Sequence, residues 1–337
     1  MNIQRKIQFI MDKSRKSISA EYLRAAALLL FTIATIGMAC RFEPFYTGYY
    51  SFAWWSYILF AQSYLHLKGG RSLLFENPKK FLLMLPVSIT VWLIFEAANF
   101  RLSNWHYVEI PASTPARWVG YPVAYSTVLP GIFSTAALLD YFGVFKNSGL
   151  SPLSKPEKLY KPFYCVGALF LVLPLIGPQF FFPLIWGAFI FLLEPINHKH
   201  GAPSLLRAWE KGSLRKFYIL LLSGALCGLL WELWNFRAGA KWVYTVPYVG
   251  GLKVFEMPLL GFLGFPPFAV ECYAMTASIF LLIRTIKERF PRKEALGYYV
   301  LGACLVVLFD LFVFAGIDKF TILSFQDIGF LPFGLKH

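Results

Sequence analysis

Hydrophobic runs alternate with short polar and basic segments along the whole chain. Nine runs are long enough to cross a bilayer, at about residues 23–40, 48–66, 80–98, 121–143, 161–177, 179–196, 216–235, 257–283 and 296–316. A spanning helix needs roughly 20 mainly apolar residues. The runs are continuous and do not alternate with a period of two, so they predict helices and exclude a β-barrel. We therefore predict an all-α, polytopic membrane bundle of about nine transmembrane helices.

A polar signature occurs twice, each time at the end of a hydrophobic run. An acid, an amide and an arginine form its first part: Glu96, Asn99 and Arg101 in one copy, Glu232, Asn235 and Arg237 in the other. Two aromatic residues follow in each copy: Trp105 and Tyr107, then Trp242 and Tyr244. The similarity extends further, because residues 57–74 align with 189–206, and Pro122 and Pro130 match Pro258 and Pro266.

This similarity predicts two four-helix repeats and one additional helix. The predicted segments are a basic interfacial N-terminal segment (1–22), the first repeat (23–145), a linker (146–159), the second repeat (160–285), a ninth helix (286–316) and an outer-side tail (317–337). Four is an even number of spans, so both repeats start on the same side of the membrane. They should be parallel repeats related by an axis along the membrane normal.

Composition and charge support a membrane location. The chain is 57% hydrophobic and 15% charged, whereas soluble domains carry roughly 25% charged residues. With the N-terminus in the cytoplasm, 24 of the 32 Lys and Arg residues fall on the inner side, as the positive-inside rule requires. We therefore expect a multi-pass protein of the inner (cytoplasmic) membrane with its C-terminus outside. The net charge of +14 then indicates contact with anionic membrane lipids and not with nucleic acid.

The signature glutamates are the leading catalytic candidates. Glu and Asn three positions apart share a helix face, and a carboxylate near the membrane boundary should face the bundle interior. In the functional interpretation, Glu232 and Glu96 act as an acid and its partner, and the two asparagines orient them. Arg101 and Arg237 would hold a polar head group. In the structural interpretation, each glutamate pairs with an arginine and only clamps helices together.

The aromatic residues after each signature also allow two interpretations. Trp105, Tyr107, Trp242 and Tyr244 can form an aromatic belt at the headgroup level. Alternatively, they bind a substrate and cover an apolar ring or a developing cation, because aromatic faces stabilise cations.

Two further acids lie deep in hydrophobic runs. Glu271 has Thr135 at the corresponding place in the first half, and Asp310 lies midway along the last run. Intramembrane acids are functional candidates by default, so we predict Glu271 as an accessory carboxylate and Asp310 as a substrate-binding residue. In the structural alternative, they satisfy one another or a nearby tyrosine, Tyr273.

Metal and cofactor motifs do not occur in the sequence. The five cysteines show no CxxC spacing, and there is no Walker loop, dinucleotide fingerprint, GxSxG or HExxH. We therefore expect neither a metal site nor a cofactor.

The succession of an acid, a Trp-x-Tyr and a proline resembles the integral-membrane lycopene cyclase domain of carotenoid synthesis. The matching residues are Glu232, Trp242-Val243-Tyr244 and Pro258, with Glu96, Trp105-His106-Tyr107 and Pro122. That family's proline is followed by paired glutamates, whereas Val123-Ala124-Tyr125 and Leu259-Leu260-Gly261 stand here. Trp231-Glu232 also resembles the small membrane terpene cyclases. Both resemblances imply an isoprenoid-like substrate.

Three functional hypotheses follow. The first is a membrane-embedded enzyme acting on an apolar lipid by acid–base chemistry. The second is a lipid or small-molecule transporter with a central cavity. The third is a non-catalytic membrane scaffold. The oligomeric state stays open.

Overall fold

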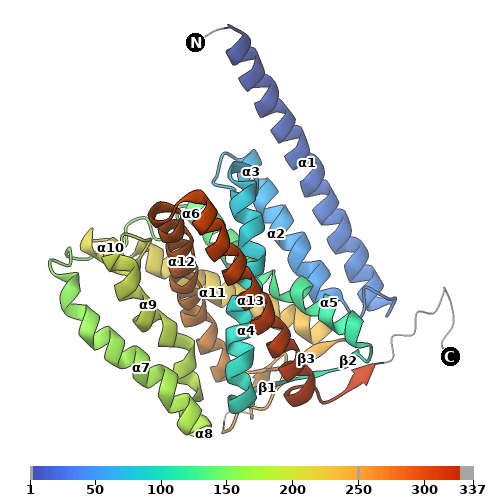
Figure 1. Ribbon diagram of the computed structural model, residues 1–337. Helices are drawn as coiled ribbons and strands as arrows, with labels where there is room; N and C mark the ends of the chain where they lie inside the picture. The colour runs from blue at the N-terminus through green and yellow to red at the C-terminus, as the bar shows by residue number, and fades with distance from the viewer. Residues whose placement is uncertain (1–2, 249–250, 327–337) are drawn as a thin grey trace.

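The computed structural model describes residues 3–248 and 251–326, with side chains for residues 17–248 and 251–325, and shows a helical bundle (Figure 1). The long helices are α1 (Ile3–Ala39), α2 (Tyr49–Leu67), α4 (Pro78–Leu102), α7 (Tyr160–Ile176), α11 (Arg215–Arg237), α12 (Phe265–Arg289) and α13 (Arg292–Phe320). The shorter helices are α3 (Leu73–Glu76), α5 (Thr114–Tyr125), α6 (Val128–Tyr141), α8 (Pro178–Phe181), α9 (Ala188–Lys199), α10 (Leu205–Glu210) and the 3₁₀ turns η1 (Pro156–Leu159), η2 (Phe182–Gly187) and η3 (Leu259–Gly264). The prediction of a polytopic α-helical bundle is confirmed.

Eight helical segments in the described part of the chain are long and apolar enough to cross a membrane. They contain eight of the nine predicted spans; the exception is 48–66. That segment does form a 19-residue helix, α2, but it is rich in Tyr and Trp and carries the buried polar residues Ser56, Gln62 and Ser63. It packs against α1, α6 and α11, whose side chains cover these polar groups.

Helix α1 runs without interruption from Ile3 to Ala39 (Figure 1). The sequence between Ile3 and Gly37 contains neither proline nor glycine, so nothing ends the helix at residue 22. The predicted basic segment therefore continues directly into the first span, and its first two residues lie outside the described part of the chain.

Proline-containing breaks divide the fourth span of each predicted half. Helix α5 ends at Tyr125 and α6 begins at Val128, with Pro130 in the first turn of α6. The short turn η3 likewise precedes α12, which has Pro266 in its first turn. Breaks at membrane depth are tolerated where they line a cavity or are covered by protein.

An aromatic core joins the first and second halves. Trp54 of α2 contacts Trp231 and Trp234 of α11, with ring centroids 5.5 and 4.8 Å apart. Phe95 of α4 stacks on Trp186 of η2 at 5.2 Å. These rings interlock α2 and α4 with elements from the other half of the chain.

Six strands of two to four residues supplement the helices in the described part of the chain, and the fold remains all-α. They are β1 (Trp105–Val108), β2 (Ile110–Pro111), β3 (Lys241–Tyr244), β4 (Lys253–Val254), β5 (Met257–Pro258) and β6 (Phe325–Gln326). They form three two-stranded sheets: β1 with β3, β2 with β6 and β4 with β5. β1, β2 and β3 lie at one end of the bundle, whereas α3 and α10 lie toward the other (Figure 1).

The linker and the tail each attach to a distant part of the chain. In the linker, the Leu150 N–H donates to the Gly212 carbonyl at 3.1 Å. Beyond α13, the Leu323 N–H donates to the Tyr107 carbonyl at 2.8 Å, so the tail extends along β1. Residues 327–337 of the predicted tail lie outside the described residues.

Candidate functional site

The two signature asparagines join a helix end to the strand that follows it. The Asn99 Nδ2 donates to the Trp105 carbonyl at 2.9 Å, and its Oδ1 accepts from the Asn104 N–H at 2.8 Å. The Asn235 side chain bonds the Trp242 carbonyl and N–H, both at 2.9 Å. Both asparagines are fully buried. Their amides are thus engaged by backbone groups and hold β1 and β3 in place; they do not contact the glutamates.

The four predicted aromatic residues lie together on one antiparallel sheet. Trp105 pairs with Tyr244, and Tyr107 pairs with Trp242. Side chains two positions apart on a strand point to the same face, so all four project to one side of this pair of strands. The sheet therefore unites the aromatic parts of the two signatures.

Glu96 is surrounded by aromatic donors. Its carboxylate accepts hydrogen bonds from the Trp92 Nε1 at 2.8 Å, the Trp105 Nε1 at 3.2 Å and the Tyr107 hydroxyl. The Tyr125 hydroxyl donates to that of Tyr107 at 3.0 Å. Burial and the adjacent Glu96 raise the pKa of Tyr107 well above its usual value, so its hydroxyl stays protonated.

Glu232 has fewer partners. Its Oε1 accepts from the Tyr244 hydroxyl at 2.7 Å, and the Trp242 Nε1 donates to the same hydroxyl at 2.8 Å. Its Oε2 is buried and has no hydrogen-bond partner among the described residues. Burial and Glu232 raise the pKa of Tyr244 well above its usual value. Of the two signature acids, Glu232 keeps a free acceptor.

A cavity of about 1030 Å³ adjoins this sheet, and we call it the outer cavity. Its walls are mostly apolar and come from α2, α5, η2, η3, β1 and β3. Tyr107 and Tyr244 line it, whereas Glu96 and Glu232 do not. Each predicted catalytic carboxylate therefore lies one layer behind the wall, and a tyrosine hydroxyl stands between it and the cavity.

Three charged side chains line the outer cavity, and each has a polar partner. Arg117 forms an ion pair with Asp318 at 2.7 Å, and Lys241 pairs with Glu256 at 2.9 Å. The Glu43 carboxylate accepts from the Thr47 hydroxyl at 2.6 Å. Both positive charges of the wall are therefore paired with carboxylates, whereas Glu43 has no counter-ion among the described side chains.

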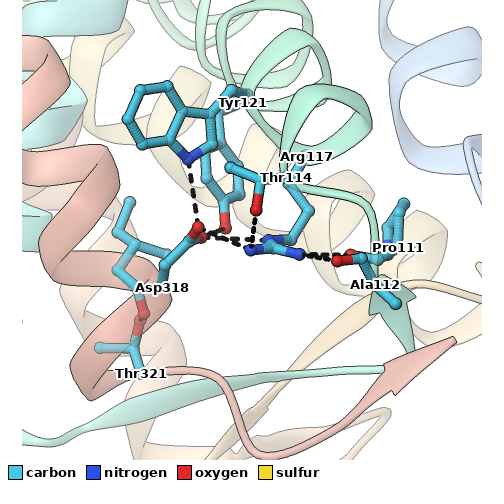
Figure 2. A network of polar contacts seen from close by, with 9 residues as sticks. Pro111, Ala112, Thr114, Arg117, Tyr121, Asp318 and Thr321 are labelled. Carbon is cyan, nitrogen blue, oxygen red and sulfur yellow. Dashed lines mark hydrogen bonds and ion pairs between the residues drawn. The ribbon is translucent and has the colours of Figure 1, made fainter.

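Figure 2 shows the Arg117–Asp318 network, which connects α5 to the end of α13. Asp318 also accepts hydrogen bonds from the Trp118 Nε1 at 3.1 Å and the Tyr121 hydroxyl at 2.8 Å. Arg117 also donates to two backbone carbonyls, those of Pro111 and Ala112. The sequence did not indicate this network, because its two charges lie about 200 residues apart. The available signal was an arginine next to a hydrophobic run.

The signature arginines do not reach the site. The Arg101 Nε donates to the Leu175 carbonyl at 3.0 Å, and Arg237 is exposed beside the Phe236 ring. Neither lines the outer cavity, and neither forms an ion pair with a glutamate among the described side chains. The predicted Glu–Arg clamp is therefore wrong, because aromatic donors occupy the places it assigned to arginine.

The deeper acids have local partners. The Glu271 Oε1 accepts from the Phe189 N–H at 2.7 Å, which satisfies a donor in the first turn of α9. Asp310 accepts from the Thr90 hydroxyl at 3.2 Å. Neither acid lines the outer cavity, and neither bonds the other or Tyr273 in the described structure. The alternative that they satisfy one another is wrong, since their partners come from other helices.

No protein-family model, curated protein or solved structure matches the chain. The resemblance to the lycopene cyclase domain therefore stays a prediction based on the signature residues. The candidate site is assigned from its geometry: a large apolar cavity, two tyrosine hydroxyls in its wall and a buried carboxylate behind each.

Proposed function

We propose that the protein is a membrane-embedded enzyme that binds a neutral, apolar lipid of isoprenoid type in the outer cavity and acts on it by acid–base chemistry. The observation that carries this proposal is the pairing of Tyr244 in the cavity wall with the buried Glu232 behind it. A cavity of about 1030 Å³ is at the upper end of the usual range for ligand pockets, roughly 300–1,000 Å³.

The chemistry would proceed through the tyrosine. When the ligand loses a proton to the Tyr244 oxygen, the hydroxyl proton of Tyr244 passes to Glu232 along their 2.7 Å hydrogen bond. The reverse transfer delivers a proton to the ligand. Glu232 is better suited to accept a proton than Glu96, because one of its oxygens has no donor. Glu96 already accepts hydrogen bonds from three side chains, which stabilise its carboxylate form.

A neutral ligand fits the charges of the wall. A phosphate-bearing lipid would need an arginine or lysine free to bind it, and Arg117 and Lys241 are already paired with carboxylates. The cavity also borders exposed apolar side chains, Val119 and Leu263. An apolar ligand would therefore enter laterally from the bilayer.

We further propose that the two halves are parallel repeats that meet at a local two-fold axis. The antiparallel register pairs His106 with Val243, the middle positions of the two Trp-x-Tyr motifs. Corresponding positions are also in contact in both halves: the Tyr57 and Thr135 hydroxyls are hydrogen-bonded at 2.6 Å, and the Phe189 backbone N–H donates to the Glu271 carboxylate at 2.7 Å. With the N-terminus in the cytoplasm, this arrangement places both strands and the outer cavity near the outer face.

Lipid mass spectrometry on protein in nanodiscs tests the proposal. Glu232→Gln and Tyr244→Phe are compared with the wild type and with Arg237→Gln, an exposed control beside the same signature. We expect an enriched neutral lipid in the wild type and in the control. Both site variants should either lose this lipid or bind it without converting it. Bulk membrane lipid alone in all four proteins, with the site variants merely less stable, would instead support the scaffold.

A transporter is the second candidate, favoured by the broken helices that line the outer cavity. Discontinuous helices at ligand sites are a feature of transporters. Cysteine labelling separates the two functions, with the cysteine placed at Ser51 in the cavity wall. In a transporter, reagents on one face of the membrane should label this cysteine with substrate present, and reagents on the opposite face should label it without substrate. In an enzyme, reagents on the same face should label it in both cases.

A further inference from the structure

A second cavity of about 300 Å³ lies among α7, α9, α10, α11 and α12, and we call it the inner cavity. Aromatic and aliphatic side chains form most of its wall, among them Phe163, Phe170, Phe191 and Phe217. Glu194 is the one ionisable residue among those that line it. An acid in an otherwise apolar intramembrane pocket is costly to keep without a partner.

Two polar groups in this wall lack a partner in the described structure. Glu194 is 1% exposed, and its Oε2 accepts from the Leu205 and Leu206 N–H groups at 2.7 and 3.1 Å. Its Oε1 is buried and accepts no hydrogen bond. The indole N–H of Trp209, also in the wall, is buried and unpaired. Two residues of this wall therefore hold one hydrogen-bond acceptor and one donor that are without a partner, and each costs free energy while unsatisfied.

The first half shows how the same position is satisfied without a ligand. In the alignment of 57–74 with 189–206, Gln62 corresponds to Glu194. The Gln62 Oε1 accepts from the Leu74 N–H at 3.1 Å, as Glu194 does from Leu206, while its Nε2 donates to the Ser134 hydroxyl at 2.9 Å. The residue corresponding to Ser134 is Val270, which lines the inner cavity and has no polar group to offer. The second half therefore has a cavity where the first half has an internal hydrogen bond.

We propose that the inner cavity binds the hydroxyl-bearing end of a neutral apolar lipid. The ligand O–H donates to the Glu194 Oε1, and its oxygen accepts from the Trp209 Nε1, so a single hydroxyl satisfies both unpaired groups. A carboxylate would be repelled by Glu194, and an ammonium has no lone pair to accept from Trp209. The volume is roughly ten times the 30 Å³ share of a water molecule, and an apolar chain fits its phenylalanine walls better than a water cluster does.

This site does not depend on the chemistry proposed for the outer cavity. Pro183, Trp186 and Pro267 line both cavities, so one layer of side chains separates them. The groups that recognise the hydroxyl nevertheless belong to α9 and α10, on the far side of that layer from Tyr244. Loss of binding at one cavity would leave the other proposal standing.

Photolabelling of the full-length protein in nanodiscs tests the proposal. The probe is a long-chain fatty alcohol with a diazirine in mid-chain, and the matched probe is its methyl ether, which has no O–H. We expect the alcohol to label peptides that contain Phe163, Phe217 or Leu221 about tenfold more strongly than the ether, as the loss of one hydrogen bond implies. Equal labelling by both probes would overturn the assignment, and so would no labelling of these peptides, because water alone would then fill the cavity.

Two substitutions at one position sharpen the test. Val270→Ser supplies the hydroxyl that Ser134 supplies in the first half, so it should satisfy Glu194 internally and lower labelling by the alcohol several-fold. Val270→Ala removes a similar volume without adding a donor and should keep the labelling. Thermal unfolding checks that both variants are folded. Undiminished labelling in folded Val270→Ser would contradict the role of the Glu194 oxygen.

Discussion

Asp318→Asn tests how strongly the Arg117 network holds the last helix. The substitution keeps the side-chain shape but removes the charge and places an amide N–H₂ near the donors of Arg117. Breaking a buried ion pair costs about 3–5 kcal/mol. The side chains are 6% exposed for Arg117 and 18% for Asp318, and Arg117 keeps its two backbone carbonyls. We therefore expect a smaller loss, about 2–3 kcal/mol of the free energy of unfolding.

The assay is the rate of thermal unfolding in nanodiscs at a fixed temperature, because unfolding of large proteins is often irreversible. If the network breaks before the unfolding transition state, about 2–3 kcal/mol corresponds to a rate increase of about 30- to 150-fold. Asp310→Asn is the matched control in the same helix, since Asp310 has one hydrogen bond, from Thr90, and should change the rate by less than about fivefold. Equal unfolding rates for the two variants would refute the reasoning.

A double-mutant cycle separates the ion pair from the other contacts of Asp318. Arg117→Gln removes the charge that Asp318→Asn leaves buried without a counter-ion. If the pair is the main contribution, the double variant should unfold more slowly than the sum of the two single effects implies. Strict additivity would assign the stability to Trp118 and Tyr121 instead.

Three further predictions concern stability. Asn235→Ala leaves two backbone groups of β3 without their partner and should lower the free energy of unfolding by about 1–3 kcal/mol in chemical denaturation, whereas Arg237→Ala nearby should change it by less than about 0.5 kcal/mol. Gly224→Ala would place a methyl group against a backbone carbonyl of α12 and should cost about 1–3 kcal/mol, whereas Gly120→Ala meets no atom within 4 Å and should not destabilise; melting curves compare the two. Burial lowers the pKa of His106 from 6.5, so as the pH falls the unfolded chain takes up a proton at this histidine before the folded protein does. The stability that His106 contributes is therefore present above pH 6.5 and is lost as the pH falls. His106→Gln should flatten this part of a stability–pH curve.

The hydrophobic pattern predicted the bundle because length and apolarity alone determine which segments can cross a membrane. It placed the helix at 48–66 correctly, and the crossing of the membrane by this helix stays a prediction. Trp54 and Gln62 on that helix are buried by neighbouring helices, and their polar atoms belong to the protein interior. The strands β1 and β3 were not predicted, because two four-residue segments from different halves form a sheet only after the helices bring them together.

The signature predicted which residues lie close together but not how they are layered. The signature correctly grouped Glu96 with Trp105 and Tyr107, since they are close in the sequence and their hydrogen bonds are local. It could not show that the tyrosine faces the cavity and the carboxylate lies behind it, because that order depends on the β1–β3 register. Arg101 follows the signature in sequence, yet it lies outside the site because it continues the helix toward the surface.

The two proposed repeats differ in where they place carboxylates. Glu194 and Glu271 stand where the first half has Gln62 and Thr135. Gln62 and Thr135 form hydrogen bonds with neighbouring side chains. Glu194 and Glu271 instead each keep one carboxylate oxygen without a hydrogen-bond partner in the described structure, as Glu232 does. A role confined to holding helices together would favour the satisfied forms, because an unpaired buried carboxylate oxygen lowers stability. Three such oxygens in the second half therefore support the proposal that this half carries the binding chemistry, with the first half mainly as its structural counterpart.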